Sequence, residues 1–265
     1  MNALRQFFHI FDFQVLLIST LAVGATYLCI NHGLHSDLPS SLIAVAIVFP
    51  IVFSIGAAYQ RREEALRSLS ALRAGIAALY FAHRDWVDAD DSGRHAPRAQ
   101  SLGRALYEAV RRALMAKAEE RSEDNLRVYA AFSAYSRSHE ELRNAGVGST
   151  EISRANNFLW SMMSAFETMR MIADYRTPGS LRAFSSIYLN LFPILYAPFY
   201  ADLATRGGDV FGYGVAIAYA CVLVGLNNIQ DHLENPFDGI GQDDVSFEPF
   251  PELEATPPFE GGGKV

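Results

Sequence analysis

Four stretches of the chain are apolar enough to cross a lipid bilayer. They run over residues 15–30, 41–59, 187–203 and 210–226. A span needs about 20 apolar residues, so the first stretch is slightly short and the aromatic residues 11–13 extend it. Between residues 61 and 182 no window is apolar enough to span. The pattern therefore predicts an all-α, multi-pass membrane protein with four transmembrane helices and one helical region outside the membrane.

The second apolar stretch runs into charged sequence without a signal that would end a helix. No Gly or Pro occurs between Gly56 and Gly75. One helix is therefore expected to leave the membrane and to continue to about residue 82, and its first 33 residues alone are roughly 50 Å long. Its apolar half carries Val45, Phe49 and Phe53 at positions i, i+4 and i+8, which places them on one helix face.

The last two stretches differ from ordinary lipid-facing helices. Pro193 and Pro198 both lie in the third stretch, which predicts a broken helix buried among partners. The fourth stretch carries three glycines that permit close helix packing, namely Gly212, Gly214 and Gly225.

The charged region between the spans has a helical period. One apolar stripe is formed by Leu66, Leu69, Leu72, Ile76 and Leu79. Residues 88–97 (DADDSGRHAP) have the composition of a turn or loop. Further helices are expected at about residues 99–119, 123–144 and 151–175, with a break at 146–150. This region is therefore predicted to be a helical domain of about 120 residues.

Composition narrows the functional classes. Half of the 265 residues are apolar and 19% are charged, and the formal charge of −7 argues against nucleic acid as a partner. Cys29 and Cys221 lie in apolar runs and are interpreted as buried free thiols. The seven histidines show no metal-ligand spacing, and the chain offers no phosphate loop or nucleophile–base set. The spans contain essentially no polar groups for catalysis, so the chain is not expected to be an enzyme.

Charge also predicts the orientation in the membrane. The second and third spans are flanked on one side by Arg61, Arg62, Arg67, Arg73, Arg176 and Arg182. The positive-inside rule then places both termini and the helical domain in the cytoplasm. The expected location is the cell (inner) membrane. The expected organisation is an interfacial segment (1–13), two transmembrane helices (14–59), a cytosolic helical domain (60–182), two more transmembrane helices (183–226) and an acidic C-terminal arm (227–265).

Three groups of residues, in the right order along the chain, resemble the bestrophin family. The segment from Asn227 to Gly239 contains Asn235-Pro236-Phe237 and is followed by Gln242-Asp243-Asp244, which is similar to the family's NPF signature and acidic cluster. Ala57-Ala58-Tyr59-Gln60-Arg61, with Glu64-Ala65 after it, is similar to the end of the family's pore helix. Thr177-Pro178, Arg182 and Tyr188 resemble the entry into its third span.

The resemblance implies a homopentamer whose pore runs down the fivefold axis and is narrowed by rings of apolar side chains from the second helix. Alignment through Tyr59 and Arg61 places this neck at Val45, Phe49 and Phe53. Alignment through Pro50 and Gly56 gives Phe49, Phe53 and Ala57 instead. Phe49 and Phe53 belong to both registers, and such a ring can close by dewetting because it offers an ion no replacement for its water shell.

The resemblance also implies two further sites. A cytosolic constriction is expected just before the third span, where Ile172, Tyr175 or Arg176 would face the axis. Asn235, Asp243 and Asp244 are candidates for a calcium clasp, since hard oxygen ligands suit this ion. Gly239-Ile240-Gly241 interrupts the acidic run of this clasp, so a solvated acidic arm is the favoured interpretation and little calcium dependence is expected.

Two functions remain open from the sequence. The first is a bestrophin-like channel for small inorganic ions, with chloride or bicarbonate as the expected ions and a cation-conducting homologue as the alternative. The second is a non-conducting membrane scaffold with the same fold. The partners expected for either are other copies of the chain and the lipid bilayer.

Overall fold

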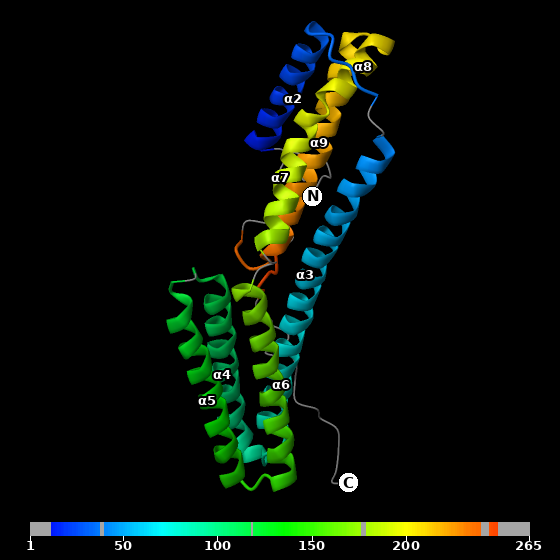
Figure 1. Cartoon of the computed structure of the whole chain (residues 1–265). Helices are drawn as coiled ribbons and strands as arrows, with labels where there is room; N and C mark the ends of the chain where they lie inside the picture. The colour runs from blue at the N-terminus through cyan, green and yellow to red at the C-terminus, as the bar shows by residue number, and fades with distance from the viewer. Residues whose placement is uncertain (1–11, 38–39, 118, 176–178, 240–243, 249–265) are drawn as a thin grey trace. The chain divides into compact units, whose positions relative to one another are not determined.

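The computed structural model describes residues 12–37, 40–117, 119–175, 179–239 and 244–248, and within them the side chains of residues 40–50, 89–91 and 181 are not described. All regular structure in these ranges is helical, which confirms the predicted all-α class (Figure 1). The helices are α2 (Phe13–Asn31), α3 (Ser40–Asp85), α4 (Ala89–Met115), α5 (Arg121–Asn144), α6 (Ser149–Asp174), α7 (Gly179–Leu195), α8 (Ala197–Gly207) and α9 (Asp209–Glu234).

The chain divides into two compact units. Unit 1 consists of Met1–Arg62, Arg176–Pro236 and Ile240–Asp243, and unit 2 consists of Glu63–Tyr175, Phe237–Gly239 and Asp244–Val265. The first part of α3 belongs to unit 1 and its remainder belongs to unit 2. Each unit is built from segments that are distant in the sequence.

Unit 1 contains the apolar helices α2, α7, α8 and α9, which pack side by side (Figure 1). The α2 helix begins at an N-cap, where Asp12 Oδ1 accepts the backbone N–H groups of Gln14 and Val15 at 2.9 and 3.2 Å. Such a cap satisfies donors that the first turn of a helix leaves without partners. Among the described residues, α2 and α9 are long and apolar enough to cross a membrane.

The third predicted span is broken, as its prolines indicated. The α7 helix ends at Leu195 and α8 begins at Ala197, with Pro198 in the first turn of α8. The backbone N–H groups in the first turn of a helix have no intrahelical acceptor. Proline, which lacks an N–H, therefore costs no hydrogen bond at this position. The break turns the chain into a short helix that packs on α9.

The glycines of α9 differ in what surrounds them. A Cβ atom on Gly212 would lie 2.7 Å from Ala204 Cβ and from the Tyr200 carbonyl oxygen of α8, so only glycine permits this approach. A Cβ on Gly214 would meet nothing within 4 Å. Close packing is therefore confirmed at Gly212, whereas no described element of this chain packs against Gly214, where the prediction stays open to a second copy.

Unit 2 buries the apolar stripe that the sequence predicts on α3. Four of its members (Leu69, Leu72, Ile76 and Leu79) are at most 5% exposed, and Leu66 packs against the same core. The core also contains Leu106 of α4, Phe132 of α5 and Phe166 of α6. The predicted break between the last two helices is confirmed, since α5 ends at Asn144 and α6 begins at Ser149.

The predicted loop at residues 88–97 was wrong, because α4 begins at Ala89 and runs through Pro97. Pro97 is exposed, whereas His95, Ala99 and Leu102 are buried on the other face of the same helix. Burial of that face against the core outweighs the one backbone hydrogen bond that proline removes. Local composition therefore misled here, and tertiary packing decided the conformation.

Candidate functional site

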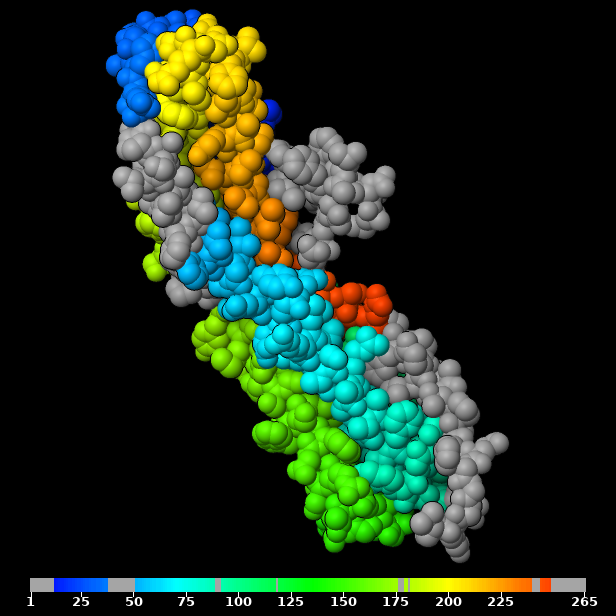
Figure 2. Space-filling model, turned by 90° about the vertical axis from the view of Figure 1, so that its right-hand side faces the viewer, coloured from blue at the N-terminus to red at the C-terminus, as the bar shows by residue number. Residues whose placement is uncertain are grey.

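Near the end of its apolar half, the α3 helix has one face that is exposed at the surface of this chain. Phe53 is 62% exposed and Ala57, one turn later, is also exposed. Ile51, Ser54 and Ala58 lie on the opposite face and are at most 4% exposed. In Figure 2, α3 faces the viewer and its outer side is visible from residue 51 onward. The side chains of Val45 and Phe49 lie outside the described residues.

Contacts on the buried face of α3 fix the direction in which Phe53 points. Ile51 packs with Leu189 of α7 and Leu223 of α9 in one apolar cluster, and Ile55 lies against it. Because successive helix residues are rotated by about 100°, this packing directs Phe53 away from α7 and α9. The packing of Ile51 therefore leaves the Phe53 side chain on the outer surface of unit 1.

Polar groups gather where α9 ends. Glu234 is 4% exposed and forms an ion pair of 3.5 Å with Arg182 of α7. Asn227 Nδ2 donates to Asp231 Oδ2 at 3.2 Å on the same face of α9. A buried carboxylate is costly unless it is paired, so the contact with Arg182 ties the start of α7 to the end of α9.

The NPF segment acts as an anchor for the chain after α9. Phe237 is 2% exposed and belongs to the core of unit 2, where its ring lies 6.2 Å from that of Phe247. Phe247 also lies 5.9 Å from the ring of Tyr107, whose hydroxyl donates to the Glu248 carbonyl at 2.9 Å. Phe237 therefore holds this segment by packing in the core of unit 2.

The residues of the implied calcium clasp fall in different parts of the chain. Asn235 is the C-cap of α9 in unit 1, and Asp244 belongs to unit 2, where its Oδ2 accepts the backbone N–H of Gly239 at 2.6 Å. Asp243 lies outside the described residues. Within the described ranges no three His, Cys, Asp or Glu side chains are grouped to hold a metal ion. A calcium clasp at these residues stays the alternative to the favoured solvated acidic arm, and the low calcium dependence stays a prediction.

The three candidates for a cytosolic constriction have different environments. Ile172 is 9% exposed and belongs to the core of unit 2, whereas Tyr175, the C-cap of α6, is 70% exposed. Arg176 lies outside the described residues. The end of α6 is held by Arg121, whose guanidinium donates to the Ala173 carbonyl at 3.0 Å and to Asp174 Oδ1 at 2.7 Å.

Unit 2 also contains a buried histidine pair that the sequence did not indicate. His83 is fully buried, with Nδ1 2.7 Å from the Leu79 carbonyl oxygen and Nε2 2.9 Å from Ser138 Oγ. The ring of His139 lies 6.1 Å away. Burial lowers the pKa of His83 to about 4, because the charged ring would lose its hydration. His83 is therefore neutral at pH 7, with Nδ1 donating to Leu79.

Similar proteins were found by comparing structures, whereas the two comparisons based on sequence found none. No family model matches the chain, and no curated protein matches it. Several solved structures resemble it. One, described as a membrane protein, is 19% identical with a TM-score of 0.71, and the match covers 89% of this chain and 92% of that one.

Two other similar structures identify the fold more closely, since both are of a bacterial bestrophin homologue from Klebsiella pneumoniae. One is 19% identical with a TM-score of 0.71, over 89% of this chain and 92% of that chain. The other is 18% identical with a TM-score of 0.74, over 88% of this chain and 91% of that chain. The chain therefore has the bestrophin fold, and the resemblance read from its motifs is confirmed at this level.

Proposed function

We propose that the chain is one subunit of a bestrophin-like channel, a homopentamer in the cell membrane that passes small anions such as chloride or bicarbonate. Four membrane segments per subunit, formed by α2, the first part of α3, α7 with α8, and α9, surround a central pore. Both termini and unit 2 lie in the cytoplasm. The observation that carries the proposal is the outward aromatic face of α3 at Phe53, in a chain with the bestrophin fold.

Exposure of the Phe53 ring to water is unfavourable. A large aromatic side chain that is 62% exposed in a single copy of the chain favours further cover by lipid or by another protein surface. Five copies of this face around one axis would form an apolar ring, together with Phe49 and with Val45 or Ala57 according to the register. Such a ring admits ions only when it is wide enough to stay wet.

A second ring is proposed at the end of α6. Of the two described candidates, Tyr175 is 70% exposed, whereas Ile172 is 9% exposed and belongs to the core of unit 2, so the exposure favours Tyr175. Arg176 next to it would add a positive charge from each subunit, which favours anions. The arginines at the inner end of the α3 span, Arg61 and Arg62, favour the same sign.

The decisive experiment is a current measurement on purified protein in planar bilayers under a salt gradient. We expect a current whose reversal potential follows the anion gradient. Phe53→Ala should widen the neck and raise the open probability. Val52→Ala is the matched control, because Val52 is also 62% exposed but is rotated by about 100° from Phe53.

The outcomes separate the remaining functions. A reversal potential that follows the cation gradient would indicate a cation-conducting homologue. If no current appears even after Phe49 and Phe53 are both changed to alanine, the channel function fails and a non-conducting scaffold takes its place. Equal effects of Phe53→Ala and Val52→Ala would mean that Phe53 does not face the pore.

A further inference from the structure

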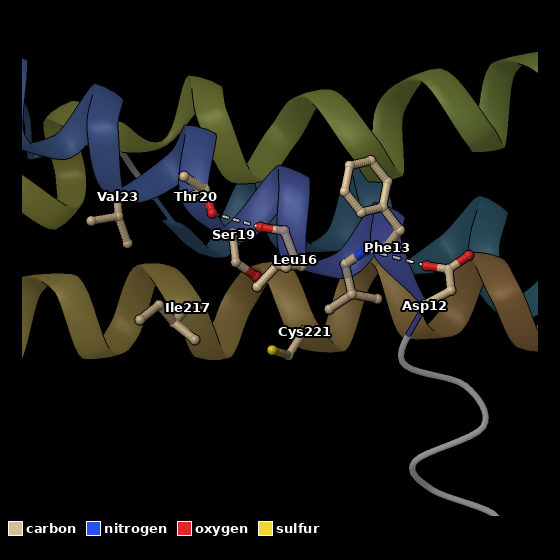
Figure 3. A pocket seen from close by; sticks show the side chains of 9 residues that line it. Asp12, Phe13, Leu16, Ser19, Thr20, Val23, Ile217 and Cys221 are labelled. Carbon is tan, nitrogen blue, oxygen red and sulfur yellow. Dashed lines mark hydrogen bonds between the residues drawn. The ribbon is translucent and has the colours of Figure 1, made fainter.

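A groove of about 680 Å³ runs between α2 and α9 on unit 1 (Figure 3). Its walls are mostly apolar and include Leu16 and Val23 of α2 with Ile217 and Cys221 of α9. Asp12 stands at one end, where α2 begins. The α2 and α9 helices are also the two described helices that are apolar and long enough to span a membrane, so the groove lies along lipid-facing helices in the proposed function.

One polar atom in this groove has no partner among the described residues. Ser19 is 9% exposed and its hydroxyl makes no hydrogen bond, although it points towards α9 across the groove (Figure 3). The neighbouring hydroxyl of Thr20 differs, since it donates to the Leu16 carbonyl at 2.8 Å. A buried donor without an acceptor is unfavourable, so the groove calls for an occupant that carries an acceptor at the level of Ser19.

The distance from Asp12 to Ser19 along α2 can be compared with the thickness of the headgroup layer of a bilayer. Seven residues separate it from Asp12, which corresponds to about 10 Å along a helix. The polar interface on each side of a bilayer is roughly 5–7 Å thick. With Asp12 at the outer edge of the headgroups, Ser19 therefore lies about 3–5 Å below the boundary where the ester carbonyls of lipids meet the hydrocarbon. Beyond it, Val23 and Ile217 offer only apolar surface.

We propose that this groove is the binding site of one bilayer glycerophospholipid. An acyl chain lies between α2 and α9, and an ester carbonyl accepts a hydrogen bond from the Ser19 hydroxyl. The carboxylate of Asp12 favours a headgroup that carries an amine over one with net negative charge. A helix of a second copy would fit less well, because its backbone carbonyls are already engaged within the helix and offer Ser19 no free acceptor.

The proposal rests on the membrane location in the proposed function and is independent of ion conduction. It is tested on the full-length protein in detergent by titration with palmitoyl-oleoyl-phosphatidylethanolamine, with bound lipid counted by native mass spectrometry. Cys221→Trp should fill the groove and weaken binding by about tenfold or more. Val222→Trp is the matched control, since Val222 neighbours Cys221 but does not line the groove, and it should leave the affinity unchanged.

Two finer measurements test the chemistry of the site. Ser19→Ala should weaken binding about fivefold through loss of one hydrogen bond. The corresponding phosphatidylglycerol, which has the same chains and an anionic headgroup, should bind more weakly than phosphatidylethanolamine. Added phosphatidylethanolamine should also slow alkylation of Cys221, while Cys29, which lies outside the groove on α2, should react at an unchanged rate.

The following results would contradict the proposed lipid-binding site. Equal affinities for the Cys221→Trp and Val222→Trp variants would show that lipid does not bind in the groove. An unchanged affinity in Ser19→Ala would remove the role of the hydroxyl. A photo-crosslinker at position 221 that captures a second copy in place of lipid would assign the groove to an interface. Loss of current with intact lipid binding would refute only the channel function.

Discussion

The two units of this chain place their apolar side chains in opposite ways. In unit 1, Val210, Phe13 and Leu16 are 86%, 76% and 65% exposed on α9 and α2. In unit 2 the large aliphatic side chains of α3 point inward and the exposed surface carries arginine–glutamate pairs such as Arg127–Glu123 at 2.6 Å. Unit 1 is thus built for an apolar surrounding and unit 2 for water, although one helix contributes to both.

The two units are therefore expected to be stabilised by different interactions. The hydrophobic effect acts on side chains that leave water, so it stabilises the core of unit 2 but contributes little between helices that lipid surrounds. Unit 1 must depend on close packing, as at Gly212, and on polar contacts such as Arg182–Glu234. The following substitutions test this contrast.

The largest effect is expected from truncating the core of unit 2. Phe166 is fully buried among Phe132 and Tyr129, so Phe166→Ala should lower the free energy of unfolding by about 3–5 kcal/mol. Val222→Ala on the exposed side of α9 should change it by less than about 0.5 kcal/mol. Chemical denaturation of both variants in the same detergent measures the difference, and similar losses would contradict the proposed contrast.

The next effect concerns the buried histidine of unit 2. The folded pKa of His83 is about 4 against 6.5 for a free histidine, because burial disfavours the charged ring. Below pH 6.5 the unfolded chain binds more protons, so stability is complete above pH 6.5 and falls as the pH drops towards 4. The loss from His83 alone should be about 3 kcal/mol.

The matched variant for this pH effect is His83→Gln, which removes the titrating ring. Its midpoint of denaturation should depend less steeply on pH between 6.5 and 4 than that of the unchanged protein. Some dependence should persist, because burial also lowers the pKa of His139. An identical pH profile in the two proteins would show that His83 does not titrate in this way.

The smallest effect tests close packing in unit 1. Gly212→Ala would place a Cβ atom 2.7 Å from Ala204 and Tyr200, and the forced shift should cost about 1–3 kcal/mol. Gly214→Ala meets open space on the same helix and should be neutral or stabilising by about 0.5–1 kcal/mol. Thermal denaturation of the pair compares them, and a loss of the same size at Gly214 would mean that an unseen surface covers it.

Much of the fold could be predicted because hydrophobic period and length are properties of the sequence itself. The stripe through Leu72 and Ile76 on α3, the break after Pro193 and the end of α5 before Gly146 all follow from local signals. The candidate site was less accessible. Periodicity places Phe53 and Ala57 on one helix face but does not say which face the other helices cover, and the contacts of Ile51 with α7 and α9 provide that information.

The helical class, the apolar and charged regions and the motifs that resemble those of bestrophins can all be predicted from the amino-acid sequence. The helix over residues 89–97, the burial of Ile172 beside the exposed Tyr175, and the contact of His83 with Ser138 of another helix depend on the folded chain. The physical reason is the range of the forces involved. Period and capping act within a few residues, whereas burial and long-range hydrogen bonds depend on segments that meet only in the folded chain.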